Sequence, residues 1–152
     1  VLPNPKVNEN TKYVPGTNGE KMSKSKGNVI DIFLPEKELK KQIMSIETDS
    51  TPIEEPKDFV SCNVFKLYAL IADQKSIENL KENYKMGGYG YGHAKKELLR
   101  FILNEFISQR EKFNHYMNNL DEIDSALNVG ANKASKVALE VIQRVRNKLG
   151  YN

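Results

Sequence analysis

The sequence predicts an all-α protein, a helical bundle preceded by an extended loop segment. Two observations lead to this fold class. Residues 1–33 contain three prolines and three glycines without helical periodicity, which is typical of turns and extended chain. From residue 34 onward apolar residues recur at steps of three and four, the spacing of amphipathic helices, and no alternating strand pattern interrupts them. We therefore expect about four to six helices.

The composition narrows the class of protein. A length of 152 residues fits one domain, or one domain with an attached segment. The net charge of +3 permits a nucleotide or RNA partner without requiring one. The single cysteine, Cys62, cannot form a disulfide within the chain, and no Cys/His cluster has metal-ligand spacing, so we expect a reducing, cytoplasmic setting and no metal site. No apolar run approaches the roughly 18 residues of a membrane span, so no membrane partner is expected.

Three shorter helices are expected first. One begins at Pro35 and ends near residues 48–50, and its apolar stripe consists of Leu39, Ile43 and Ile46. The next is marked by Val64, Leu67, Tyr68 and Ile71. A third has Ser76 as its expected cap and ends at Gly87 and Gly88, and its apolar face carries Ile77, Leu80 and Tyr84.

Two longer helices are expected to follow. One covers residues 94–117, with an apolar stripe that contains Leu99, Ile102, Phe106, Phe113 and Met117. The other follows Gly130 and ends at Gly150, with inward-facing positions at Ala134, Ala138, Val141, Val145 and Leu149. Its alanines favour close approach to a neighbouring helix.

A lysine-rich loop is the main candidate site. Residues 19–28 read GEKMSKSKGN, with three lysines, two serines and a glycine near each end. Lysine ammonium groups suit phosphate oxygens, serine hydroxyls add donors, and glycine lets the backbone approach a ligand. The spacing is not that of a P-loop, and no helix is expected directly after the lysines. A solvated basic loop is the alternative interpretation.

The string KMSKS at residues 21–25 resembles the signature loop of class I aminoacyl-tRNA synthetases. The whole chain is similar to bacterial tryptophanyl-tRNA synthetases in particular. The stretches that carry this likeness are Thr48-Asp49-Ser50, Gly130-Ala131-Asn132-Lys133-Ala134, Val145-Arg146 and Gly150-Tyr151. One departure is Asn18-Gly19, where the family often has Asp-Gly; both pairs favour the same turn.

The resemblance implies a role for each residue of the loop. Lys21 and Lys24 would be catalytic, because they would hold the triphosphate of ATP as charge builds on the departing pyrophosphate. Met22 and Ser23 would contact the nucleotide, and Ser25 belongs to the same ATP-binding loop. The cofactor of the whole enzyme would be ATP with Mg²⁺, and its other substrates would be tryptophan and tRNA(Trp).

The resemblance also implies that the chain is a fragment. It contains no His-Ile-Gly-His-like motif, which in the family belongs to a Rossmann-type catalytic domain that precedes the loop. Residues 1–33 would then be the end of the catalytic domain, 34–56 a connecting helix and linker, and 57–152 a helical anticodon-binding domain. The whole enzyme would be a homodimer, and the fragment alone would be inactive.

A basic strip on the last predicted helix is the candidate RNA contact. It consists of Lys133, Lys136, Arg144 and Lys148, at helical spacing. A solvated helix face and contact with an RNA backbone are both compatible with it. Two further alternatives stay open for the chain as a whole: the equivalent fragment of another class I synthetase, and a helical interaction module without RNA binding.

Overall fold

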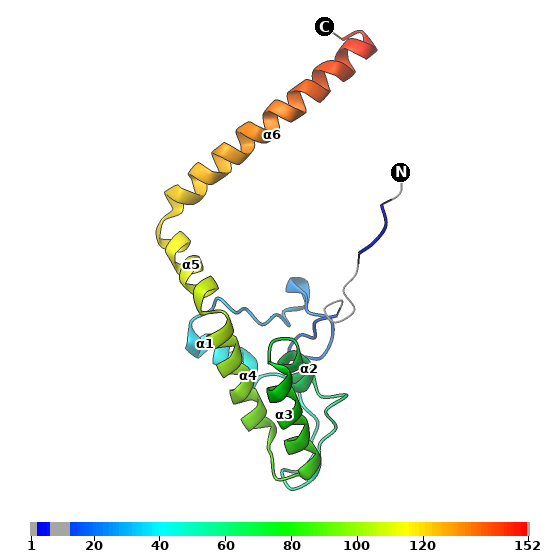
Figure 1. Cartoon of the computed structure of the whole chain (residues 1–152), viewed down its shortest axis with the longest axis vertical. Coiled ribbons are helices and arrows are strands. Elements are labelled where there is room, and N and C mark those ends of the chain that lie inside the picture. The colour runs from blue at the N-terminus through cyan, green and yellow to red at the C-terminus, as the bar shows by residue number, and fades with distance from the viewer. Residues whose placement is uncertain (1–2, 7–12, 152) are drawn as a thin grey trace. The chain divides into compact units, whose positions relative to one another are not determined.

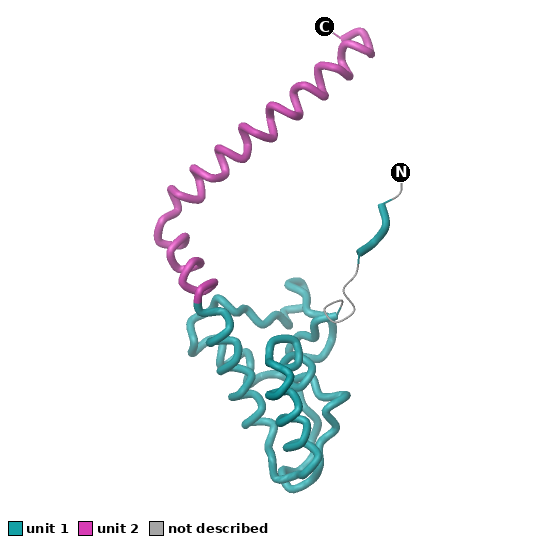
Figure 2. The backbone as a smooth tube through the Cα atoms, in the orientation of Figure 1, with its two compact units in different colours: residues 1–107 teal, residues 108–152 magenta. Residues whose placement is uncertain are grey.

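The computed structural model describes residues 3–6 and 13–151. The chain divides into two compact units, residues 1–107 and residues 108–152 (Figure 2). These units are defined by packing and not by function. The connecting helix predicted within residues 34–56 lies in the first unit, together with the helices that follow it up to residue 107. The functional boundaries at residues 33 and 56 therefore remain a prediction.

The first unit is helical, as predicted (Figure 1). Helix α4 packs against α1 and α2, and α2 also contacts α3. In the part of the chain that the structure describes, β-type pairing is limited to an isolated antiparallel bridge between Pro15 and Lys21. The elements of this unit are a 3₁₀ turn η1 (Lys24–Lys26), α1 (Glu36–Met44), α2 (Asn63–Ala69), α3 (Gln74–Met86) and α4 (Tyr91–Glu105).

The core of this unit is formed by the predicted apolar stripes. Leu39 and Ile43 of α1 have no exposed surface, and burying such side chains is the main driving force for folding. The other buried core residues are Ile30, Ile46, Cys62, Val64, Leu67, Tyr68, Leu80, Tyr84, Ala94, Leu98, Leu99 and Ile102. Ile30 brings the chain just after the lysine loop into the same core.

Tyr84 of α3 is the aromatic centre of the core. It is fully buried, and its ring lies 5.9–6.1 Å from those of Phe65, Tyr89 and Tyr91, within the range of favourable aromatic pairs. Its hydroxyl lies 3.6 Å from the Cys62 sulfur. Burial raises the pKa of Tyr84 far above its ordinary value, so this hydroxyl stays neutral.

Two buried lysines hold loops to this core through backbone carbonyls. Lys57, 4% exposed, donates from Nζ to the carbonyls of Pro52, Ile53 and Glu55 at 2.9–3.3 Å. Lys95 of α4 donates to the carbonyl of Met44 at 3.0 Å, at the end of α1. Burial lowers the pKa of Lys95. Neither lysine is available as a free surface cation.

Several predicted helix boundaries are wrong by a few residues. The cap of α3 is Asp73 rather than Ser76, because the Asp73 carboxylate accepts from the Ser76 N–H at 2.9 Å and from its hydroxyl at 2.8 Å. Helix α2 ends at Ala69, so Ile71 lies beyond it. The predicted end of α3 at Gly87 is confirmed. A Cβ there would lie 2.3 Å from the Glu54 carbonyl oxygen, so only glycine fits.

The single helix predicted over residues 94–117 is wrong. The chain forms α4 up to Glu105 and a separate α5 (Ile107–Asn118), and Phe106 between them leaves helical geometry at φ −102° and ψ 20°. No proline or glycine lies at this point, so local sequence contains no breaker that would have indicated it.

The second unit consists of α5 and α6 (Leu120–Leu149). Helix α6 runs through Gly130, where the sequence had predicted a start. The cost of one glycine, about 1 kcal/mol, is outweighed by the many good helix formers around it. The predicted inward face is also wrong: Ala134, Ala138, Val141, Val145 and Leu149 are all exposed. Among the described residues, none of the helices is long and apolar enough to cross a membrane.

The core assignment can be tested with one substitution at two sites. We expect Leu39→Ala to lower the free energy of unfolding by about 2–5 kcal/mol, because it leaves a cavity in a fully buried position. The matched change Leu127→Ala, at a residue that is 64% exposed, should change it by less than about 0.5 kcal/mol. Urea unfolding followed by circular dichroism measures both. Equal midpoints for the two variants would contradict the packing of α1.

Candidate functional site

The lysine loop is built on a small backbone hairpin. The Met22 N–H donates to the Val14 carbonyl at 2.9 Å, and the Gly16 N–H donates to the Glu20 carbonyl at 2.7 Å. The turn between them is closed by the Gly19 N–H, which donates to the Gly16 carbonyl at 3.1 Å. The turn that Asn18-Gly19 favours is therefore confirmed.

The buried side chain of Asn28 holds this loop by hydrogen bonds. It is only 2% exposed, and its side-chain amide uses both its donors and its acceptor. Its Nδ2 donates to Asn18 Oδ1 at 2.7 Å and to the Lys21 carbonyl at 3.3 Å, while its Oδ1 accepts from the Ser23 N–H at 2.8 Å. These bonds fix the backbone on both sides of Met22, so one buried side chain sets the path of the KMSKS segment.

Gly16 makes room for Asn28. A Cβ at Gly16 would lie 2.4 Å from the Asn28 carbonyl oxygen and 2.5 Å from its Cγ. The same carbonyl oxygen accepts from the Thr17 N–H at 2.9 Å. Any side chain at position 16 would therefore displace the loop. Sequence reasoning noticed Asn28 only as part of a motif, because a polar residue in a loop is ordinarily exposed.

The three lysines of the loop differ in their partners. Lys26 Nζ lies 2.7 Å from Glu20 Oε2 in an ion pair. The pair lowers the pKa of the Glu20 carboxyl and raises the pKa of Lys26. The largest cause of both shifts is the hydrogen bond between the two groups, followed by the attraction between their charges. Lys21 and Lys24 are exposed. Within the described residues, neither of their ammonium groups has a hydrogen-bond or ion-pair partner. Two of the three cations are thus uncommitted, and they are the two that the sequence singled out.

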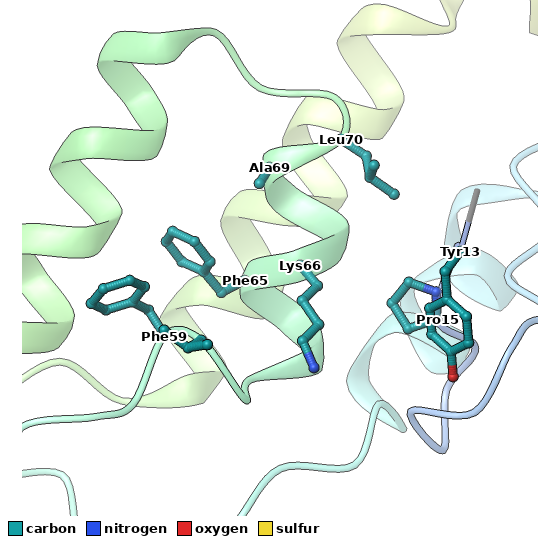
Figure 3. Close-up of a pocket in the computed structure, with 8 residues that line it drawn as sticks. Tyr13, Pro15, Phe59, Phe65, Lys66, Ala69 and Leu70 are labelled. Carbon is teal, nitrogen blue, oxygen red and sulfur yellow. The ribbon is translucent and has the colours of Figure 1, made fainter. Parts of the chain in front are cut away.

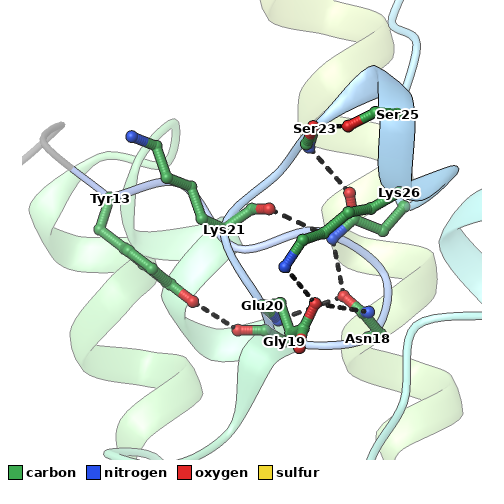
Figure 4. Close-up of polar contacts among 9 residues, drawn as sticks. Tyr13, Asn18, Gly19, Glu20, Lys21, Ser23, Ser25 and Lys26 are labelled. Carbon is green, nitrogen blue, oxygen red and sulfur yellow. Dashed lines mark hydrogen bonds and ion pairs between the residues drawn. The ribbon is translucent and has the colours of Figure 1, made fainter.

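The serines of the loop point toward each other. The hydroxyl oxygens of Ser23 and Ser25 lie 2.9 Å apart (Figure 4). Ser25 lies in the 3₁₀ turn Lys24–Lys26, a local helical turn that the sequence did not predict. The pair leaves hydroxyl donor and acceptor capacity on the same loop as the two uncommitted lysines.

Met22 packs against the core of the first unit. Its side chain is half-buried against the core, and its N–H is already bonded to the Val14 carbonyl. Beside it lies an apolar hollow of about 210 Å³, whose walls include Ile30, Leu67, Leu98 and Ile102. Met22 therefore anchors the loop to α2 and α4, while Lys21 and Lys24 remain exposed.

A larger groove of about 450 Å³ opens beside the start of the loop (Figure 3). Its lining is mainly carbon, and the single cation in it, Lys66, donates to the Ser61 carbonyl at 3.1 Å. The Tyr13 hydroxyl in its wall donates to the Gly19 carbonyl at 2.9 Å. The groove is therefore unlike a phosphate site. Its lining residues are Tyr13, Pro15, Phe59, Val60, Phe65, Lys66, Ala69 and Leu70.

The predicted basic strip lies on α6, in the second unit. Because α6 is one continuous helix, the residues of the strip lie on one side of it, along about four turns. All of its members are exposed, and in the part of the chain that the structure describes none of them forms an ion pair. The strip consists of Lys133, Lys136, Arg144 and Lys148.

Comparison with known proteins decides the family. Residues 2–107 match the sequence profile of the class I tRNA synthetases of the W and Y type. The chain belongs to this family. The lysine loop, with the KMSKS string at residues 21–25, lies within the matched region.

Known relatives and solved structures agree with this assignment. Tryptophan–tRNA ligase of Campylobacter jejuni strain RM1221 is 46% identical over 150 residues, which are 99% of this chain and 47% of that protein. The corresponding enzyme of Fusobacterium nucleatum is 44% identical over 149 residues, covering 98% and 46%. The crystal structure of the Campylobacter jejuni tryptophanyl-tRNA synthetase with ADP and tryptophan has a TM-score of 0.88 at 46% identity, covering 95% of this chain and 46% of that one. The chain spans about half the length of the curated relatives it matches.

The role of Asn28 can be tested by hydrogen exchange. We expect Asn28→Ala to speed exchange of the Ser23 amide by about five-fold or more, because that N–H loses its acceptor. Asn28→Asp keeps the acceptor but loses both donors, so Ser23 should stay better protected than in Asn28→Ala. Amide exchange measured by NMR on the 152-residue chain distinguishes these outcomes. Wild-type protection of Ser23 in Asn28→Ala would contradict the bracing role.

Proposed function

We propose that the chain is the C-terminal part of a tryptophan–tRNA ligase and that it supplies the ATP-phosphate loop and the anticodon-side RNA contacts of the enzyme. One observation carries the first role: Lys21 and Lys24 are exposed and uncommitted on a loop whose backbone is braced by Asn28. The identity of the relatives, which are tryptophan–tRNA ligases, supports the choice of amino acid.

The loop would act by electrostatic stabilisation. In the proposed reaction a carboxylate oxygen of tryptophan attacks the α-phosphorus of ATP, and the bond to the bridging oxygen of pyrophosphate breaks. Negative charge then builds on the departing pyrophosphate, where cations positioned in advance are most effective. Lys21 and Lys24 would supply this charge. The hydroxyls of Ser23 and Ser25 would donate to phosphate oxygens, and Met22 would keep the segment on the core while it moves.

The residues present fit a metal that arrives with the nucleotide. Groups of three or more His, Cys, Asp or Glu side chains that could hold a metal ion are absent from the described residues. Mg²⁺ commonly keeps several waters and binds to substrate phosphates rather than to a dedicated protein site. When bound, it would offset charge on the triphosphate. Lys21 and Lys24 would contact the phosphate oxygens left free.

The helical part would contribute RNA binding. The strip on α6 offers four exposed cations along one side of a helix, which suits contact with a phosphate backbone. The tryptophan pocket would lie in the half of the enzyme that this chain does not include, so the chain alone would not activate tryptophan. The resemblance further implies that the whole enzyme is a cytoplasmic homodimer.

The lysine roles can be tested in the full-length enzyme. We expect Lys21→Ala and Lys24→Ala each to slow tryptophan-dependent ATP–pyrophosphate exchange by about 10²–10³-fold, because each removes a cation from the developing charge. Lys26→Ala is the matched control, since Lys26 is already paired with Glu20, and it should cost less than about ten-fold. Equal losses in all three variants would count against specific roles for Lys21 and Lys24.

The RNA role can be tested on the 152-residue chain. Binding of a tRNA(Trp) anticodon stem-loop should weaken with salt, and replacing all four strip residues by glutamine should reduce the slope of log K against log salt by about three. The control replaces four exposed lysines of the first unit, Lys37, Lys40, Lys41 and Lys75, by glutamine. A slope that is unchanged in the strip variant would contradict the assignment. Equal affinity for a stem-loop with an altered anticodon would favour a general basic surface.

A further inference from the structure

A polar hollow of about 280 Å³ lies between α3 and α4 in the first unit. It is separate from the KMSKS loop and from the strip on α6, and the roles proposed above do not use it. Unlike the two apolar hollows beside the loop, it has more polar than apolar lining. Its walls are formed by Tyr68, Ser76, Asn79, Leu80, Asn83, Tyr89, Glu97 and Arg100.

One wall of the hollow presents two amide side chains. Asn79 and Asn83 lie four residues apart on α3, so they occupy the same face one turn apart. Among the described residues, neither side chain forms a hydrogen bond. Each amide offers two N–H donors and one carbonyl acceptor. The wall therefore has free donors and acceptors at helical spacing.

Another part of the lining is an ion pair on α4. Arg100 Nη2 lies 2.9 Å from Glu97 Oε2, and the side chains are 62% and 40% exposed. A guanidinium group has five N–H donors, and a carboxylate has several acceptor positions. One contact between the two groups leaves most of this capacity free. Both groups can therefore still bind a ligand.

The remaining walls are aromatic and aliphatic. Tyr68 and Leu80 are each 3% exposed, so they form the buried part of the lining. Tyr89 is half-buried, and burial raises its pKa to about 12, so it stays neutral. Its ring stands in the loop between α3 and α4, 5.5 Å from the His93 ring. A flat ligand could pack against such a surface while its edge meets the amides.

We propose that this hollow binds a single unpaired base of the RNA that the chain recognises. A base has an apolar face and an edge of mixed donors and acceptors, and this lining complements both. The volume is too small for a duplex, and proteins read RNA sequence mainly where bases are unpaired. Two amides, an arginine and a glutamate that line the same hollow can distinguish bases by their edges. The inference rests on the proposed function, and it assigns base reading to α3 and α4 and backbone contact to α6.

The experiment combines protein variants with abasic RNA. The affinity of the 152-residue chain is measured for a tRNA(Trp) anticodon stem-loop and for versions that lack one loop base each. We expect Asn79→Ala and Asn83→Ala each to weaken binding of the intact stem-loop by about five-fold. The loss should vanish at one abasic position, because a base that is absent cannot be contacted.

The control variant is Gln74→Ala. It removes an exposed amide from the same helix, and Gln74 does not line the hollow. Its affinity should match the wild type throughout the series. Losses for Asn79→Ala and Asn83→Ala that are equal at every abasic position, or no loss at all while the wild type binds, would overturn base reading and leave RNA binding intact. A wild-type chain that binds none of the stem-loops would overturn the proposed RNA function together with this inference.

Discussion

The buried amide of Asn28 is the interaction on which the candidate site depends. Its three side-chain hydrogen bonds join the turn before the KMSKS segment, the backbone of Lys21 and the backbone of Ser23. A buried amide that lost these partners would cost about 1–3 kcal/mol for each unsatisfied group. The contact leaves no space for a side chain at Gly16. A small polar contact therefore imposes a single path on a loop that has no regular secondary structure of its own.

The structure separates polar groups that hold the fold from those that remain free. Lys57 and Lys95 donate hydrogen bonds to backbone carbonyls, and Lys26 forms an ion pair with Glu20. Among the described residues, Lys21, Lys24 and the amides of Asn79 and Asn83 have no hydrogen-bond or ion-pair partner. Free groups are where ligand binding costs the least, because no existing partner has to be displaced. This distinction supports the choice of both candidate sites better than composition does.

Some of this could be predicted from the sequence and some could not. The stripes of α1 and α3 were predicted because every apolar position in them faces one core. The break at Phe106 carries no local signal, and α6 has an apolar stripe whose residues are exposed in this structure. An apolar stripe predicts that one face of a helix packs against something, but it does not identify the partner. The expected inward positions on α6 were wrong for that reason.

The sequence by itself determined the helical class, the turn at residues 16–19 and the family, and it singled out Lys21 and Lys24 as candidates, because periodicity, turn chemistry and a five-residue motif are local properties. Tertiary structure decided the rest. Only folding could bury Asn28, pair Lys26 with Glu20 and bring Asn79, Asn83, Glu97 and Arg100 into the lining of one hollow. These relations join residues that are not neighbours in the sequence, and their distances are set by how the helices and loops pack.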